Sequence, residues 1–126
     1  MPVKWSYRSS ILVVETSGQY GRDELKRALI DACADPQFAP GTPVLFDGRL
    51  SEMDISTPDV EWRVQLALAL SAMGFASRCA VVVRNDTATF GMGRMLSLRL
   101  ESGGFDLNVT RDFDEAMVWL MRPAGE

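Results

Sequence analysis

The sequence predicts an α/β protein built on one mostly parallel sheet with a single antiparallel strand at its edge. Apolar runs of strand length alternate with segments of helical periodicity in the order β-β-α-β-α-β-α-β-α. Strands separated by helices are typically joined by right-handed crossovers within one parallel sheet. The two leading strands have no helix between them, so we expect the first to be antiparallel. A length of 126 residues fits a single domain covering residues 1–126.

The first third of the chain predicts a hairpin and a helix. Residues 3–8 alternate apolar and polar side chains, and residues 10–17 form a second strand after a turn at Arg8-Ser9. A helix begins at Asp23. Its side chains at helical spacing form one apolar stripe: Leu25, Ala28, Leu29, Ala32 and Cys33.

The middle of the chain predicts two buried strands with a helix between them. Three prolines indicate a loop over residues 34–43, and the short apolar run 43–46 indicates a central strand. Thr57 is the expected N-cap of a helix that has Pro58 at its first position and ends near Gly74. The next strand is the apolar run 79–83.

The last third predicts a helix, a strand and a closing helix. The helix covers residues 88–102, and the strand covers residues 105–110. Asp112 as N-cap and Glu115 three positions later form a capping-box pattern. The closing helix is expected to pack five side chains inward: Phe113, Ala116, Met117, Leu120 and Met121.

Composition excludes several classes of function. The chain has no histidine, which removes Ser-His-Asp and Cys-His catalysis and nearly every zinc site. A net charge of −4 without a basic cluster argues against nucleic-acid binding. The two cysteines, Cys33 and Cys79, are expected to be free thiols, and no metal or cofactor is expected. The N-terminus lacks a signal-peptide pattern and no apolar segment is long enough to span a membrane, so we expect a soluble, cytoplasmic protein.

Polar residues follow the third and fourth predicted strands, at the end of the sheet where ligands usually bind. They are Asp47, Arg49, Asp54, Ser56, Arg84, Asn85, Asp86 and Thr87. Asp, Asn, Ser and Thr are also the residues that caps and turns require, and this structural role is the favoured interpretation. Two weaker alternatives are a phospho-accepting Asp47, as in receiver domains, and metal-dependent hydrolysis with Asp47, Glu52 and Asp54 as ligands. The first lacks the receiver's acid pair and lysine, and the second matches no calcium-loop spacing.

The glycines of "FGMGRM" (Phe90 to Met95) do not form a dinucleotide fingerprint. The G-x-G-x-x-G pattern lacks its third glycine here, and it does not directly follow the first strand as the fingerprint requires. Glycine inside a helix costs about 1 kcal/mol relative to alanine. We therefore expect another element to pack closely against Gly91 and Gly93.

Two predicted helices carry more apolar side chains than packing on a sheet requires. Those of the second helix are Val60, Trp62, Val64, Leu66, Leu68, Leu70, Met73 and Phe75. Those of the third are Phe90, Met92, Met95, Leu96, Leu98 and Leu100. The surplus face must meet another helix, a second chain, a lipid-like ligand or a membrane surface. Extra helix–helix core or a homodimer is the favoured interpretation, and a ligand groove is the second.

The element order, "PVLFDGR", "CAVVVRNDTATFGMGRM" and above all "FDLNVTRDFDEAMVWL" resemble the bacterial SpoIIAA-like family. That family is related to STAS domains, the anti-sigma-factor antagonists, and more distantly to the lipid-binding CRAL-TRIO fold. The likeness covers about residues 3–120. It implies a small α/β domain without enzymatic activity, associated with binding of apolar ligands and membranes between its middle helices.

Anti-sigma antagonists carry the tetrad D-S-S-G at the start of the second helix, where one serine is phosphorylated. Here the tetrad reads Asp54-Ile55-Ser56-Thr57, so the first serine and the glycine are replaced. The resemblance thus implies Ser56 as the candidate phosphosite, at a helix N-terminus that favours added negative charge.

These observations lead to three hypotheses. The first is a non-enzymatic domain that binds an apolar small molecule, a protein partner or a membrane surface through its second and third helices. Its expected contact residues are Trp62, Leu66, Leu70, Met73, Phe90, Met92 and Met95. The second is a phosphoregulated antagonist acting through Ser56, and the third and weakest is a carboxylate enzyme at Asp47 and Asp54.

Overall fold

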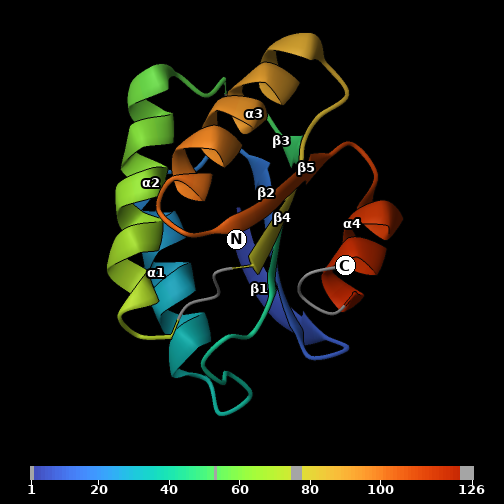
Figure 1. Ribbon diagram of the computed structural model, residues 1–126. Helices are drawn as coiled ribbons and strands as arrows, with labels where there is room; N and C mark the ends of the chain where they lie inside the picture. Colours follow the sequence, from blue (N-terminus) through green and yellow to red (C-terminus); the bar gives the residue numbers. More distant parts are fainter. Residues whose placement is uncertain (1, 53, 75–77, 123–126) are drawn as a thin grey trace.

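The structure is a computed structural model that describes residues 2–52, 54–74 and 78–122. Within these residues the elements are β1 (Val3–Arg8), β2 (Ile11–Gly18), α1 (Arg22–Ala34), β3 (Val44–Ser51), α2 (Thr57–Ser71), β4 (Arg78–Val82), α3 (Thr87–Glu101), β5 (Asp106–Thr110) and α4 (Phe113–Met121). The strands form one sheet in the order β1-β2-β3-β4-β5 (Figure 1). Strand β1 is antiparallel to β2, and every other pair is parallel. The predicted fold class is therefore confirmed.

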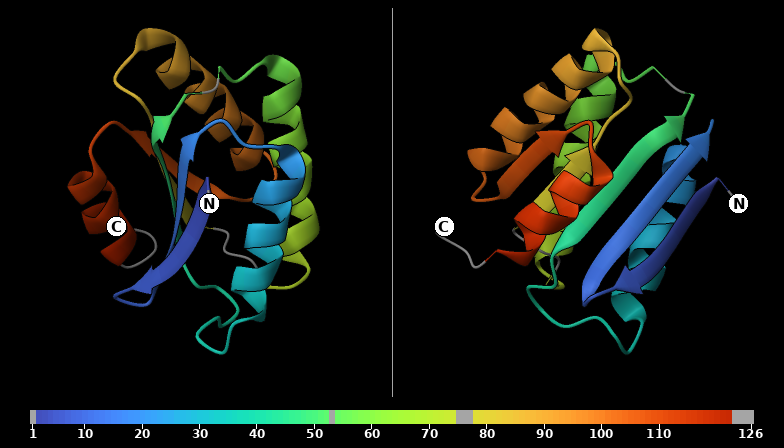
Figure 2. Two further views of the ribbon diagram at one scale, coloured as in Figure 1. Left: turned by 180° about the vertical axis from the view of Figure 1, so that it is seen from behind. Right: turned by 90° about the vertical axis from the view of Figure 1, so that its right-hand side faces the viewer.

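The topology places three helices on one face of the sheet and one on the other. Each parallel strand is added beside the previous one in the same direction, so right-handed crossovers carry α1, α2 and α3 to the same face. Within the described residues no strand follows α4, so no crossover fixes its side, and it covers the opposite face. The left view of Figure 2 shows α4 alone on its side of the sheet.

Two hydrophobic clusters fill the two interfaces. The larger lies under α1–α3 and includes Leu12, Val14, Val44 and Cys79 from the strands. The smaller lies under α4, where the alternate strand residues Ile11, Val13, Leu45, Ala80 and Val82 meet Ala116 and Leu120. This alternation is the period of two expected for strands covered on both faces.

Strand β3 is twice as long as predicted, since it runs past residue 46 to Ser51. The extension pairs with β2, where Ser17 lies opposite Leu50 and Gly18 opposite Ser51 after a register shift beginning at Glu15. Strand β4 pairs with β3 only as far as Asp47. Beyond that point β3 is paired on one side, and its polar side chains reach solvent without breaking the strand.

Several predicted boundaries move by one or more residues. The first hairpin turns at Ser9-Ser10 and not at Arg8-Ser9, with φ of 53° and 62° at the two serines. Both signs are those of a type I′ turn, whose twist matches that of the strands it joins. The N-cap of α2 is Ser56, which accepts a hydrogen bond from the Asp59 amide, so the prediction of Thr57 was wrong by one position.

Only one of the two hydrogen bonds of the predicted capping box is present at the start of α4. Asp112 accepts a hydrogen bond from the Glu115 amide (2.9 Å). The Asp112 amide donates to the Thr110 hydroxyl (3.2 Å), which in turn donates to Glu115 (3.3 Å). The Thr110 hydroxyl thus takes the place of the expected direct bond from the Asp112 amide to the Glu115 carboxylate. Met121, predicted to pack inward, lies in the last turn of α4 and is 64% exposed, so this prediction was wrong.

Only one of the two helical glycines of α3 packs closely against the sheet. A Cβ atom on Gly93 would lie 2.9 Å from Cγ1 of Val109, whereas a Cβ on Gly91 would meet open space. The expectation is confirmed for Gly93 and wrong for Gly91. Phe75 lies outside the described residues. Among the helices of the described part of the chain, none combines the length and the apolar character needed to cross a bilayer.

Candidate functional site

A cavity of about 150 Å³ lies between the sheet and the helical layer formed by α1, α2 and α3. Strands β3, β4 and β5 form one wall with Phe46, Cys79, Val81 and Leu107. The helices form the other with Leu25, Leu29, Val60, Leu66, Ala67, Met92, Leu96 and Leu100. These walls are almost entirely apolar, and neither α4 nor β1 contributes to them.

The polar lining residues gather at the carboxyl end of the strands. Tyr20 follows β2, Ser51 ends β3, Arg84 follows β4, and Arg63 lies in the second turn of α2. This is the end of a parallel sheet at which α/β proteins place their ligands. The cavity therefore runs from an apolar interior to a polar mouth.

The structure brings two of the seven predicted contact residues, Leu66 and Met92, to this cavity. Leu70 is buried in the core instead. Trp62 packs at the edge of the core beneath the guanidinium groups of Arg22 and Arg63, 5.4 and 5.8 Å from its ring centre.

The other three predicted contacts lie further from the cavity. Phe90 stacks under Arg111 at 4.5 Å, and Met73 and Met95 are exposed. Together with Leu68 and Leu98, these methionines leave exposed apolar side chains on α2, on the turn that follows it and on α3. Contact with a protein partner, a second copy of the chain or a membrane stays a prediction.

Several cavity residues were missed at the level of sequence. Leu96 and Leu100 follow Met92 at intervals of four, so the helical stripe of α3 was readable. The signal in the sequence that could have identified Arg63 was a charged residue among the apolar residues of α2. No local pattern indicates Tyr20, whose hydroxyl lies 2.8 Å from Nη2 of Arg63 because the loop after β2 passes α2.

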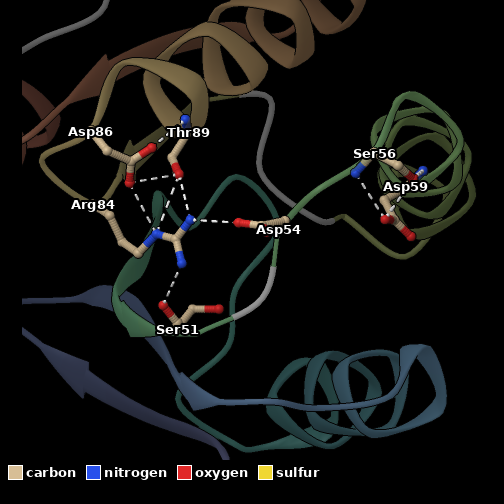
Figure 3. Close-up of polar contacts among 7 residues, drawn as sticks. All are labelled: Ser51, Asp54, Ser56, Asp59, Arg84, Asp86 and Thr89. Carbon is tan, nitrogen blue, oxygen red and sulfur yellow. Dashed lines mark hydrogen bonds and ion pairs between the residues drawn. The ribbon is translucent and has the colours of Figure 1, made fainter.

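Arg84 organises one polar cluster at the mouth (Figure 3). Its guanidinium donates to the carboxylates of Asp86 and Asp54 at 3.1 Å each and to the Thr89 hydroxyl at 2.8 Å. It also donates to the Ser51 carbonyl at 3.3 Å. Asp86 is the N-cap of α3, and its pKa is lowered by the amide and hydroxyl of Thr89 and by Arg84. The cluster ties the end of β3 to the start of α3.

Asp47 and Arg49 form a separate pair directed toward α4. Arg49 donates to both carboxylate oxygens of Asp47, at 2.9 and 2.8 Å, and its guanidinium lies 5.1 Å from the Phe113 ring centre. This bidentate bond raises the pKa of Arg49. The predicted rim is thus divided, with Asp47 and Arg49 apart from Asp54 and Asp86. Asn85 is exposed, and the side chain of Thr87 is outside the described part of the structure.

Ser56 stands at the start of α2 with its side chain exposed. Its hydroxyl donates to Asp59 at 2.7 Å, and its amide donates to the same carboxylate at 2.9 Å. Arg22 reaches the other oxygen of Asp59 at 2.9 Å. The Ser56 amide, Arg22 and the Ser56 hydroxyl hold the pKa of Asp59 well below its usual range.

The remaining candidate groups are isolated. Within the described residues, no three Cys, Asp or Glu side chains come together in a way that could hold a metal ion. Neither Cys33 nor Cys79 is part of a disulfide, as expected. Burial, with a smaller contribution from Asp106, raises the pKa of the Cys79 thiol to about 12.

Comparison of the chain with protein-family models, curated proteins and solved structures finds no match in any of the three. The assignment to the SpoIIAA-like family therefore stays a prediction.

Proposed function

We propose that this chain is a non-enzymatic ligand-binding domain that encloses a small apolar molecule between its sheet and helices α2 and α3. The observation that carries the proposal is the cavity of about 150 Å³ with apolar walls. Native interiors have few voids larger than a water molecule, so a space of this size in the larger core favours a role in binding.

The size of the cavity limits the ligand. An apolar cavity of about 150 Å³ can stay dry and accept benzene, whereas drug-sized ligands occupy pockets of about 300–1,000 Å³. A benzene-sized molecule, or the end of a longer chain, fits this conformation. Met92 in the wall can change rotamer at low cost, which favours a site that adapts to its ligand.

A matched pair of substitutions on α2 tests the proposal. Ala67 lines the cavity, and Ala69 on the same helix is exposed. Ala67→Phe is expected to fill the space and abolish the rise in melting temperature that toluene produces in the wild type, whereas Ala69→Phe retains it. Equal toluene binding by wild type and Ala67→Phe would contradict the proposal. The proposal would also be contradicted if native mass spectrometry of the unextracted protein gave the mass of the bare chain and toluene did not raise the melting temperature.

A second candidate function is a phosphoregulated switch at Ser56. The observation that favours it is the exposed serine at the N-cap of a helix, 15 residues long, whose first turn borders the cavity mouth. A phosphate on Ser56 would meet the helix dipole and Arg22, but it would also meet the ionised Asp59. It must therefore displace Asp59 from the cap and loosen the first turn of α2.

Phosphopeptide mapping of the protein from its source cells tests this switch. Phosphate on Ser56, with a lower melting temperature than that of the unmodified protein, is the expected result. Ser51, at the end of β3, is the internal control: the same phosphopeptide mapping is expected to find it unmodified. An unmodified Ser56 under all growth conditions sampled would rule the switch out.

A further inference from the structure

We propose that the ligand of this cavity carries a carboxylate, which binds the guanidinium of Arg63 at the mouth. The inference rests on the proposed binding function and adds to it the chemical class of the ligand. It starts from the position of a cation at the rim of an apolar cavity.

Arg63 is held in place by neutral partners. Its Nη1 donates to the Asp59 carbonyl at 3.1 Å, and its Nη2 donates to the Tyr20 hydroxyl at 2.8 Å. The guanidinium also lies 5.9 and 5.8 Å from the ring centres of Tyr20 and Trp62. A guanidinium has five N–H donors, so these two bonds leave donors available for a ligand.

The charge of Arg63 is not neutralised by an ion pair in the described part of the chain. Arg84, the other arginine that lines the cavity, is paired with Asp54 and Asp86, and Arg22 at the start of α1 is paired with Asp59. Asp59 senses the positive charge of Arg63, but its carboxylate is bonded to Arg22 and Ser56. A partly buried cation beside apolar walls attracts an anion more strongly than one in water does.

The surrounding acids select the kind of anion. One guanidinium matches one carboxylate in a bidentate, charge-assisted bond. A phosphate dianion would bring twice the charge toward the acids at this end of the sheet, Asp47, Asp54, Asp59 and Asp86. Among the described arginines that line the cavity, only Arg63 is without an ion pair to offset it. A carboxylate on a compact apolar body therefore satisfies both the mouth and the interior of the cavity.

Calorimetry with three probes of similar shape tests the inference at pH 7. Benzoate, benzyl alcohol and phenyl phosphate present a carboxylate, a neutral hydroxyl and a phosphate on the same ring. We expect wild-type protein to bind benzoate at least about tenfold more tightly than benzyl alcohol, as a charge-assisted bond to one group predicts. Octanoate and octanol repeat the comparison for an acyl chain, and either carboxylate preference supports the inference.

Two variants locate the preference. Arg63→Gln is expected to bind benzoate and benzyl alcohol with equal affinity, because the preference for the carboxylate is lost. Arg99→Gln, which loses a pair with Glu61 outside the cavity, is expected to keep the wild-type preference. The comparison of probes on the wild type requires no variant, so an unfolded Arg63→Gln does not remove the test.

The outcomes separate the two proposals. Equal binding of acid and alcohol by the wild type, or tighter binding of phenyl phosphate, overturns the carboxylate inference and leaves the apolar cavity in place. A preference that survives in a folded Arg63→Gln protein also overturns it. If none of the probes binds, the proposed function fails and the inference fails with it.

Discussion

Asp59 is the residue on which the start of α2 depends most. Its carboxylate accepts hydrogen bonds from the amide and hydroxyl of Ser56 and from Arg22. These bonds lower its pKa below the unfolded value of 3.8, so the folded state binds fewer protons than the unfolded state as the pH falls. The stability contributed by Asp59 is therefore complete well above pH 3.8 and is lost progressively as the pH falls below 3.8.

We therefore predict that Asp59→Asn lowers the free energy of unfolding at pH 7 by about 1–2 kcal/mol, the usual cost of losing a helix cap. Urea unfolding at pH 7 and pH 3 should show the difference from wild type shrinking in acid, because below pH 3.8 the unfolded wild-type chain takes up a proton on Asp59 that the folded state does not, and the variant lacks this group. Asp31→Asn, an exposed position on α1, serves as the control. A difference that is constant across this range would show that the carboxylate charge has no part in the cap.

Cys79 gives the opposite pH dependence at the alkaline end. Burial raises the pKa of its thiol from 9.0 to about 12, so the unfolded chain loses this proton first. Stability is then full below pH 9 and falls as the pH rises toward 12. Cys79→Ala is expected to be less stable at pH 7, because it enlarges the cavity, but to lose less stability between pH 9 and 11.

Urea unfolding at pH 8, 9, 10 and 11 measures both slopes. Tyr7, whose pKa is also raised, contributes equally to the wild type and the variant, so the difference between the slopes reports Cys79. Cys33→Ala, at a partly exposed position, should keep most of the wild-type slope. Parallel wild-type and Cys79→Ala curves would contradict the assignment.

At the scale of residues, sequence reasoning found what depends on neighbours in the chain. The capping role of Asp112 and the stripe of α1 follow from spacing alone. The polar contacts at the mouth do not, because Arg84 and Asp54 are 30 positions apart and Arg63 and Tyr20 are 43 apart. Such pairs become visible only when crossovers bring separate loops to one end of the sheet.

At the scale of elements, sequence predicted the existence of every strand and helix better than their ends. The end of β3 was misjudged because hydropathy falls after Phe46 while pairing with β2 continues to Ser51. The two glycines of α3 show the same limit. Composition indicated that a helix with glycine packs closely, but only the tertiary structure distinguishes Gly93 from Gly91.

This pair makes a matched test of helix packing. Gly91→Ala is expected to stabilise the protein by up to about 1 kcal/mol, because it improves helix propensity and meets open space. Gly93→Ala is expected to destabilise it, since the new methyl group would lie 2.9 Å from the stiff side chain of Val109. Thermal unfolding of both variants measures the effect, and a stabilised Gly93→Ala protein would show that α3 moves away from the sheet at little cost.

At the scale of the whole molecule, the two faces of the sheet have different tasks. The progressive strand order places three crossover helices over one face, and this layer contains the cavity. The other face is covered by α4, which is nine residues long and packs on a smaller cluster. The order of elements predicted a layered fold, but the cavity could not be predicted, because its volume depends on how residues from seven elements, β2–β5 and α1–α3, meet.

This division predicts where a ligand acts. A ligand in the cavity contacts α1, α2, α3 and strands β2–β5, and it stabilises the folded state by mass action. Hydrogen exchange measured with saturating benzoate should therefore slow at amides of α2 and α3 and at the ends of β3 and β4. Amides of α4 that open locally should keep their rate, because this helix does not line the cavity and local opening leaves the ligand bound. Protection confined to α4 would place the binding site on the other face of the sheet.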